Sequence, residues 1–230
     1  MSTLLVQEKQ VVIPGDVLAE GMEFLPGKGA RRENDNVIAT RVGIVSPNGH
    51  VIHIIPLSGG YSPRANDVVI GEIKDMSYSS WFVDIGYPYE ASLSLKEASS
   101  EFIERGASLS DYFSIGDIVL IKVINVTKEG NIDLTMRTPE LRKLRGGKIV
   151  TVASPKIPRV VGKLGSMITL IKEKTGCHIF AGQNGRVWIQ GPSPAAEKLA
   201  TEAIMLIDKK AHVSGLTAIV SSFLEKSKKE

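Results

Sequence analysis

Hydrophobic and polar positions alternate through much of the first 137 residues of the chain, and helical spacing appears in several segments after that point. Alternation is typical of half-buried β-strands, whereas apolar residues at i, i+4 and i+7, such as Leu164, Ile168 and Ile171, indicate an amphipathic helix. A chain of 230 residues is long enough for two to three small domains. We therefore expect a multidomain protein that is mainly β first and α+β afterwards.

Residues 1–64 are expected to form a small N-terminal β-domain of about four strands. The segment 21–36 is rich in glycine, charge and asparagine, and it is predicted to be a long exposed loop. Such a small domain buries little core by itself, so we expect it to dock against a neighbouring domain or another protein. The clearest strand patterns are residues 11–13, 37–45 and 51–55.

Residues 65–138 contain five short alternating segments, with one long, polar and partly helical connection between the third and the fourth. This arrangement predicts a five-stranded barrel. In the second segment the alternation turns Trp81 inward as a core residue and leaves Phe82 outward, and in the fourth it leaves Lys122 outward. The five segments are residues 67–74, 81–86, 91–94, 116–126 and 132–137.

Two glycines enclose a basic residue in the sequence Gly162-Lys163-Leu164-Gly165. The bend lies between a short helix that starts near Pro158 and an amphipathic helix that Gly176 ends. Glycines without side chains let a backbone pass close to a ligand such as a phosphate chain. They also suit a tightly packed corner between two helices, and these residues alone leave both interpretations open.

The remaining pattern of residues 146–213 is a strand, the two helices just described, a β-hairpin and a long helix. The hairpin turn is Gly182-Gln-Asn-Gly185, and Ser193 is placed to cap the long helix. Residues 214–230 are expected to form a C-terminal amphipathic helix and a charged tail.

The net charge of +3 is unevenly distributed, because residues 137–174 hold ten Lys and Arg against two Asp and Glu. This block includes the glycine bend and a basic connector, residues 139–147. Its charge points to an anionic partner such as nucleic acid. Within the block, Lys172 and Lys174 are expected to be ordinary exposed helix charges.

The single cysteine, Cys177, excludes an internal disulfide framework and any multi-cysteine zinc ribbon, and it is expected to be a small core residue. The four histidines stand apart, and the sequence shows no metal-ligand cluster, paired-carboxylate motif or nucleophile motif. We therefore expect no enzyme activity, no cofactor and no metal. No secretory signal or bilayer-spanning run is seen, so a soluble, cytoplasmic protein without a membrane partner is expected.

The second region resembles the ribosomal S1 RNA-binding domain, an OB-fold, through Val-Ile-Gly-Glu-Ile, Phe-Val-Asp-Ile-Gly, Ile-Gly-Asp-Ile-Val-Leu-Ile-Lys-Val and Gly-Asn-Ile-Asp-Leu-Thr-Met. The resemblance implies that the outward Phe82 stacks on a base, and that Lys122 and Arg137 contact phosphates. The alternative for Phe82 is packing against a neighbouring domain. The chain departs from the family pattern where Leu93-Ser94 stand in place of the usual histidine.

The order strand, helix, Gly-x-x-Gly, helix, strand, strand, helix resembles a type I KH domain. The resemblance implies that the backbone of the bend approaches the sugar-phosphate chain while an apolar groove receives unpaired bases. Carried over to this chain, it implies an RNA site of Gly162, Lys163, Leu164 and Gly165, with Arg159 beside the bend and Ile168 under the groove.

The order of the three domains resembles the family of RNA-binding cap subunits of the archaeal exosome that are of the ribosomal-RNA-processing type. Three segments share the resemblance, namely Val12-Ile-Pro-Gly-Asp16, Ile55-Pro-Leu57 and the hairpin residues 182–189. The resemblance implies a non-catalytic subunit that captures single-stranded RNA, A-rich RNA included, and guides 3′ ends into a hexameric phosphorolytic ring of RNase PH-like subunits. The N-terminal domain would dock on the ring, in a trimeric cap with further copies of itself or with a zinc-ribbon cap protein. The alternative is a free-standing S1/KH RNA-binding protein, such as a translation or RNA-chaperone factor.

Overall fold

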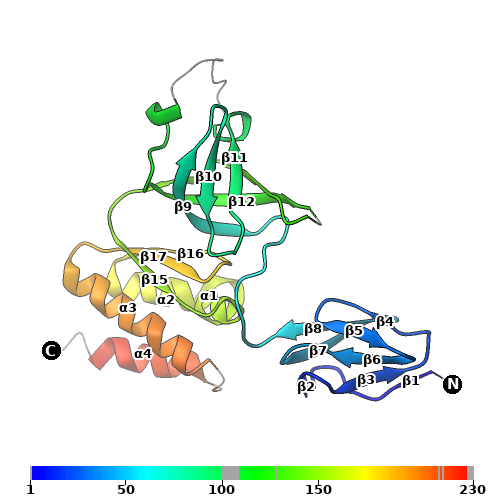
Figure 1. Cartoon of the computed structure of the whole chain (residues 1–230). Coiled ribbons are helices and arrows are strands. Elements are labelled where there is room, and N and C mark those ends of the chain that lie inside the picture. The colour runs from blue at the N-terminus through cyan, green and yellow to red at the C-terminus, as the bar shows by residue number, and fades with distance from the viewer. Residues whose placement is uncertain (1, 100–108, 128, 212, 214, 227–230) are drawn as a thin grey trace. The chain divides into compact units, whose positions relative to one another are not determined.

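The computed structural model describes residues 2–99, 109–127, 129–211, 213 and 215–226 (Figure 1). They divide into two compact units, residues 1–59 and residues 60–230. The first unit is built of strands, and the second holds a β-barrel followed by an α+β module. The predicted order of a β-domain, a five-stranded barrel and an α+β domain is confirmed.

The N-terminal unit consists of two four-stranded sheets, in the orders β1-β3-β6-β5 and β2-β7-β8-β4. The core includes Leu18 and Val37 from one sheet and Val45 and Ile52 from the other, all with no exposed surface. The strands are β1 (Thr3–Leu4), β2 (Val11–Val12), β3 (Val17–Glu20), β4 (Leu25–Pro26), β5 (Ala30–Glu33), β6 (Asn36–Ala39), β7 (Gly43–Asn48) and β8 (Val51–Pro56).

The prediction that residues 21–36 form a long exposed loop is wrong. Strand β4 pairs in parallel with β8, and β5 forms an antiparallel hairpin with β6. The charge of β5 does not prevent pairing, since Arg31 forms an ion pair with Glu33 (3.1 Å) and Arg32 donates to the carbonyl oxygens of Gly21 and Phe24. The turn residue Asn34 has a φ of 54°, the conformation that tight hairpin turns require.

The barrel of the second unit is formed by β9 (Val68–Met76), β10 (Ser80–Asp84), β11 (Ala91–Ser94), β12 (Ile118–Val126) and β13 (Ile132–Thr135). Their order is β13-β11-β10-β9-β12, and pairing of β13 with β12 closes the barrel. A further strand, β14 (Arg142–Leu144), extends the sheet beyond β12. Between β11 and β12 lie two short 3-10 helices, η1 (Leu95–Glu97) and η2 (Leu109–Asp111), while residues 100–108 of this connection lie outside the described residues.

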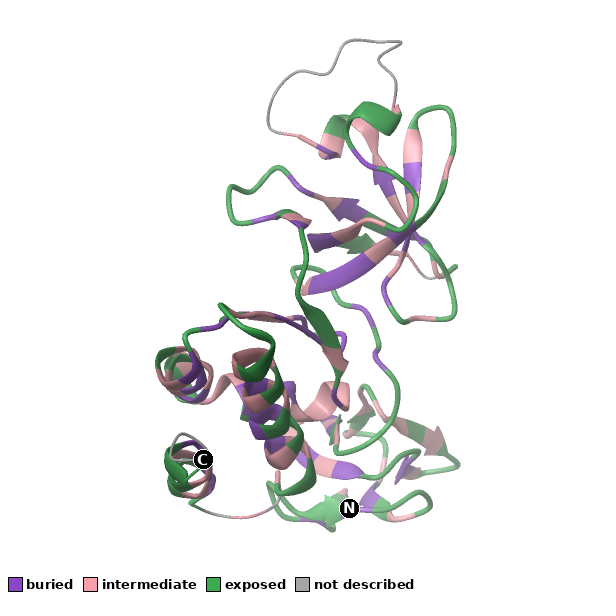
Figure 2. Cartoon of the chain, turned by 90° about the vertical axis from the view of Figure 1, so that its left-hand side faces the viewer, coloured by how far each residue is buried: buried purple, intermediate pink, exposed green. Residues whose placement is uncertain are grey.

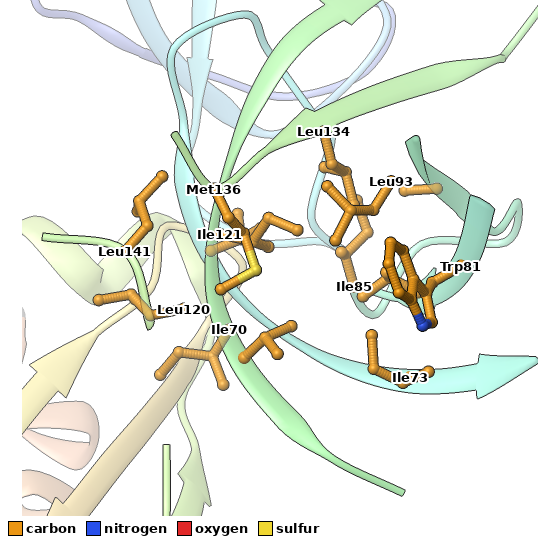
Figure 3. Close-up of a cluster of buried hydrophobic side chains, with 14 of the residues drawn as sticks. Ile70, Ile73, Trp81, Ile85, Leu93, Leu120, Ile121, Leu134, Met136 and Leu141 are labelled. Atoms are coloured by element: carbon orange, nitrogen blue, oxygen red, sulfur yellow. The ribbon is translucent and has the colours of Figure 1, made fainter. Parts of the chain in front are cut away.

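The alternation of the sequence sets which side chains fill the barrel. Trp81, Ile121 and Leu134 are buried from three different strands (Figure 3). The indole N–H of Trp81 donates to the carbonyl oxygen of Phe113 at 3.2 Å. The Trp81 and Phe113 rings also pack edge to face, with their centroids 5.4 Å apart. The predicted inward position of Trp81 is confirmed.

The α+β module has a three-stranded sheet in the order β15-β17-β16, with helices packed on one of its faces (Figures 1 and 2). Gly176 ends the second helix with a φ of 69°, and the Ser193 hydroxyl accepts from the N–H of Ala196, so both predicted caps are confirmed. The elements are β15 (Lys148–Thr151), η3 (Ser154–Lys156), α1 (Ile157–Val161), η4 (Lys163–Gly165), α2 (Ser166–Thr175), β16 (His178–Ala181), β17 (Arg186–Gln190), α3 (Pro194–Lys209) and α4 (Leu216–Lys226).

Candidate RNA interface

The outer face of the barrel carries the aromatic and basic residues that the sequence singled out. Phe82 is half-buried on β10, opposite Ser92 of β11. Ser92 is opposite Asp133 of β13, and on that strand Thr135 faces Lys122 of β12. The strand register therefore places Phe82 and Lys122 on one continuous polar strip, with the Asp133 carboxylate between them.

Arg137 follows this strip just beyond the end of β13. Its backbone N–H donates to the Thr135 hydroxyl, and its exposed guanidinium lies 3.7 Å from the Glu97 carboxylate. A pair this long and this exposed contributes little to stability, so the guanidinium can exchange Glu97 for another anion. Asp133 and Glu97 offset part of the positive charge of Lys122 and Arg137. The strip is therefore better suited to stacking than to strong electrostatic attraction.

Two exposed tyrosines lie in the turns at the two ends of β10, and the sequence pattern did not single them out. Tyr78, in the turn between β9 and β10, is 95% exposed, and Tyr89, between β10 and β11, is 58% exposed. Tyr89 lies against the turn between β12 and β13 at Gly130. In OB-folds, the loops between strands 1 and 2 and between strands 4 and 5 border the nucleic-acid face. Tyr78 lies in the first of these loops, and Tyr89 lies against the second. An aromatic residue in the serine-rich turn 77–80 was the signal that could have identified Tyr78.

The glycine bend lies between α1 and α2, as the sequence predicts. Gly162 has a φ of 76°, and an added Cβ would lie 2.7 Å from the Cβ of Met167, so this position has no room for a side chain. Gly165 has a φ of 80° and open space around it. Leu164, at the tip of the bend, has a φ of 52° and is fully exposed. A fully exposed leucine with strained backbone is unusual and suits a contact surface.

The other residues predicted at the bend are placed on both sides of it. Arg159 on α1 and Lys163 on η4 are exposed, and neither forms an ion pair among the described residues. Ile168 on α2 is partly buried and packs against the core below. The structure therefore brings Arg159, Lys163 and the two glycines together, while Phe82, Lys122 and Arg137 form a separate group on the barrel.

The turn of the β16–β17 hairpin contacts the barrel. Asn184 is buried, its amide nitrogen donates to the carbonyl oxygens of Ile70 (2.7 Å) and Ile85 (2.9 Å), and its Oδ1 accepts from the N–H of Ile70 (3.3 Å). Gln183 adds two bonds with the backbone of Val68. Strand β10 ends opposite Glu72, so it does not reach Ile70 of β9. Asn184 supplies the hydrogen-bond partners of Ile70 on this edge of β9. The sequence predicted only a turn here.

A charged pair lies beside this contact. Arg186 donates to the carboxylate of Asp84 (2.7 Å) and to its carbonyl oxygen (2.8 Å). Burial alone would raise the pKa of Asp84, but the hydrogen bonds from Arg186 and the Gly86 N–H, with the charges of Arg186 and Lys74, lower it below its usual value. Trp188 extends the contact, because its ring belongs to the hydrophobic core of the barrel. The barrel and the α+β module are therefore joined by both polar and apolar contacts.

The lowered pKa of Asp84 leads to a pH prediction. A carboxyl group whose pKa is lower in the folded state stabilises the fold at neutral pH, and this stabilisation is lost as pH falls below about 4. The pair contributes about 1.5–3 kcal/mol, the range for a hydrogen bond to a charged group. Urea denaturation of the wild type and Asp84→Asn should give a difference that is constant from neutral pH to about pH 5 and shrinks below about pH 4. A difference in the free energy of unfolding that does not change with pH would contradict this prediction.

The expectation that Lys172 and Lys174 are ordinary exposed charges is wrong for Lys172. Its Nζ lies 5.5 Å from the centroid of the Phe180 ring, and the Arg142 guanidinium lies 4.9 Å from the same centroid. The sequence could not show this, because Phe180 is on another element. Lys174, partly exposed, forms an ion pair with Glu225 at 3.2 Å.

The described residues contain no group of three or more His, Cys, Asp and Glu that could hold a metal ion. Cys177 is buried, as predicted, and its N–H donates to the Thr175 hydroxyl. In the described part of the chain, no helix is long and apolar enough to span a bilayer.

Comparison with known proteins identifies both modules of the second unit. Residues 62–137 match the model of the S1 RNA binding domain, and residues 148–206 match that of the KH domain. The Rrp4 exosome complex component of Thermococcus kodakarensis is 43% identical over 97% of this chain and 88% of its own length. Its counterpart in Methanothermobacter thermautotrophicus is 42% identical over 97% of this chain and 70% of its own length.

A solved structure is similar over most of the chain. It is a crystal structure described as that of an exosome complex RNA-binding protein, with a TM-score of 0.67 and 35% sequence identity. The match covers 74% of this chain and 98% of that one. The similarity in sequence and in fold therefore points to the same family.

Proposed function

Because the chain belongs to the family of the archaeal exosome complex component Rrp4, we propose that it is an RNA-binding cap subunit of an exosome. In this role it captures single-stranded RNA, A-rich RNA included, and guides the 3′ end into a hexameric phosphorolytic ring of RNase PH-like subunits. The observation that carries the proposal is the union of an S1 barrel and a KH module in one unit of the chain. Family membership favours this role over that of a free-standing translation or RNA-chaperone factor.

The barrel strip supplies the first RNA contact in this proposal. A base stacks on the half-buried ring of Phe82, and Lys122 and Arg137 contact the phosphates on either side. Tyr78 and Tyr89 offer two further aromatic surfaces in the turns at the two ends of β10. Stacking is tolerant of sequence, because every base has a π-face. This tolerance suits a subunit that accepts many RNAs.

The glycine bend supplies the second contact. The absence of side chains at Gly162 and Gly165 lets an RNA backbone approach the bend, while Lys163 and Arg159 neutralise phosphate charge. The exposed Leu164 and the partly buried Ile168 provide apolar surface for the bases. Binding, and no chemical step, is what these residues contribute, so we propose a non-catalytic subunit.

The N-terminal unit supplies the docking surface for the ring. Val11, Ile44 and Ile55 lie side by side on β2, β7 and β8, on the face opposite the core. Val11 and Ile55 are more than half exposed. Ile13, Val42 and Leu57 follow at strand spacing and are also exposed. An exposed apolar face of this kind is typical of a protein–protein interface. Three such subunits, as copies of this chain or with a zinc-ribbon cap protein, would complete a cap in the cytoplasm.

If this face docks on the ring, a substitution in it should weaken ring binding and leave RNA affinity unchanged. Ile55→Asp places a charge in the centre of the apolar face, so binding to the ring should fall by more than tenfold. The RNA affinity of the isolated chain should stay within about twofold of the wild type, because the second unit is unchanged. Light scattering on mixtures with ring subunits measures the first property and fluorescence anisotropy the second. The control is Leu5→Asp, another exposed apolar residue of this unit outside β2, β7 and β8. Equal ring binding by Ile55→Asp and the wild type would exclude this face as the docking surface.

A further inference from the structure

A basic groove lies where the chain leaves the barrel and enters the KH sheet. Its volume is about 390 Å³, within the range of ligand sites. Leu144 and Trp188 form its apolar part, and Arg142, Arg145 and His178 contribute polar and charged groups. None of these residues belongs to the barrel strip or the glycine bend.

The groove has a fixed frame. Strand β14 pairs with β12 of the barrel, with Leu120 opposite Arg142. At the end of β14, the carbonyl oxygen of Arg145 accepts from the side-chain amide of Gln190 (3.2 Å), and the carbonyl oxygen of Gly146 accepts from the indole N–H of Trp188 (2.8 Å). The connector is thus bonded to both modules, and its side chains are presented on ordered backbone.

The charges of the groove are only partly compensated. Lys143 forms an ion pair with Asp117 at 2.5 Å. Burial alone would raise the pKa of Asp117, but the hydrogen bonds from Lys143 and the Ser114 N–H lower it below its usual value. The positive charge of Arg145 also contributes to this lowering. Among the described residues, neither Arg142 nor Arg145 forms an ion pair of its own. Asp117 therefore pairs with Lys143 and reaches Arg145 only through a longer-range attraction.

The aromatic ring of Phe180 holds two cations close together beside the groove. Arg142 and Lys172 lie 4.9 Å and 5.5 Å from the centroid of this ring. The two charges are therefore no more than about 10 Å apart, one Debye length at 0.1 M salt. In the part of the chain that the structure describes, no carboxylate forms an ion pair with either cation. A bound anion between them would relieve their repulsion.

We propose that this junction groove, formed by Arg142, Arg145 and His178 with Lys172 beside it, binds the phosphodiester backbone of single-stranded RNA. The inference rests on the proposed RNA-binding function and adds a third contact to it. Guanidinium groups bind phosphate oxygens in a two-pronged geometry, and Arg142 and Arg145 are both exposed. An RNA that occupies the barrel strip and the groove would be held across the junction of the two modules.

The test is the salt dependence of RNA binding by the full chain. The probe is a fluorescein-labelled A-rich single-stranded RNA of about 20 nucleotides, longer than the 4–16 nucleotides that one OB-fold covers. Arg142→Gln with Arg145→Gln should weaken binding about tenfold at low salt. The slope of log K against log salt should fall by about 0.7 for each lost phosphate contact.

The matched control is Lys198→Gln with Lys209→Gln, which removes the same charge from exposed positions of α3. The control should change affinity less than threefold. Equal effects of the two double variants would show that only net charge matters and would overturn the proposal. So would unchanged RNA binding by the groove variant with weaker binding to ring subunits, because the groove would then be a protein contact. Failure of the wild type itself to bind RNA would instead reject the proposed function.

Discussion

Asn184→Ala is expected to lower the free energy of unfolding by about 3 kcal/mol. The substitution removes the hydrogen bonds of Asn184 to three buried backbone groups of the barrel, namely the N–H and C=O of Ile70 and the C=O of Ile85. The C=O of Ile70 then keeps only a long bond from Arg186, at 3.5 Å. Each unpaired buried group costs about 1–3 kcal/mol, and part of the loss is regained by local rearrangement. Urea denaturation followed by tryptophan fluorescence measures the change, because both Trp81 and Trp188 belong to the barrel core.

The matched control for Asn184→Ala is Gln183→Ala in the same turn. Gln183 is exposed, and its side chain accepts one bond, from the N–H of Val68 at 2.9 Å. Its loss should cost less than about 1 kcal/mol, because water can replace an exposed partner. Hydrogen exchange at the amide of Ile70 should accelerate in the Asn184 variant alone. Equal costs for the two variants would contradict the view that Asn184 joins the barrel to the KH module.

Phe82→Ala is expected to reduce affinity for single-stranded RNA about tenfold. Stacking of one base on an aromatic ring contributes about 1–3 kcal/mol, and 1.4 kcal/mol corresponds to a factor of ten. The ring is half-buried on the outer face of β10, so the fold should tolerate the change. Fluorescence anisotropy with the same RNA probe gives the affinity, and Phe82→Trp should preserve it.

Tyr112→Ala is the control for Phe82→Ala, because Tyr112 is an exposed aromatic residue outside the barrel strip. Its affinity should match that of the wild type. If Phe82→Ala also binds like the wild type while its thermal stability is unchanged, the barrel strip is not the stacking surface. The loss of RNA affinity caused by Phe82→Ala should persist at high salt, because stacking depends little on ionic strength. The loss caused by the variant with Arg142→Gln and Arg145→Gln should instead shrink as salt rises.

The sequence predicted the local features of the fold well. Alternation placed Trp81 in the core and Phe82 outside, and glycine chemistry placed the bend between two helices and the end of α2 at Gly176. These features depend on neighbouring residues in the chain, which is why periodicity and turn chemistry are sufficient.

Features that depend on distant residues could not be predicted in this way. Asn184 pairs with Ile70, 114 positions away, and nothing near Asn184 indicates that partner. Strand β5 was missed because its two arginines suggest exposure, whereas their charges are matched by Glu33 and by backbone carbonyls. The contact of Lys172 with Phe180 likewise depends on how α2 packs on the sheet.

The most direct test of the account is the affinity of the assembled complex for a single-stranded RNA with a free 3′ end. Ring subunits alone, the ring with this chain, and the ring with the Phe82→Ala variant are compared by fluorescence anisotropy, with phosphate omitted so that the RNA stays intact. A cap subunit should make RNA binding at least tenfold tighter than that of the ring alone, and Phe82→Ala should remove much of that gain. Equal affinities with and without the chain, under conditions where light scattering shows it bound to the ring, would contradict the account.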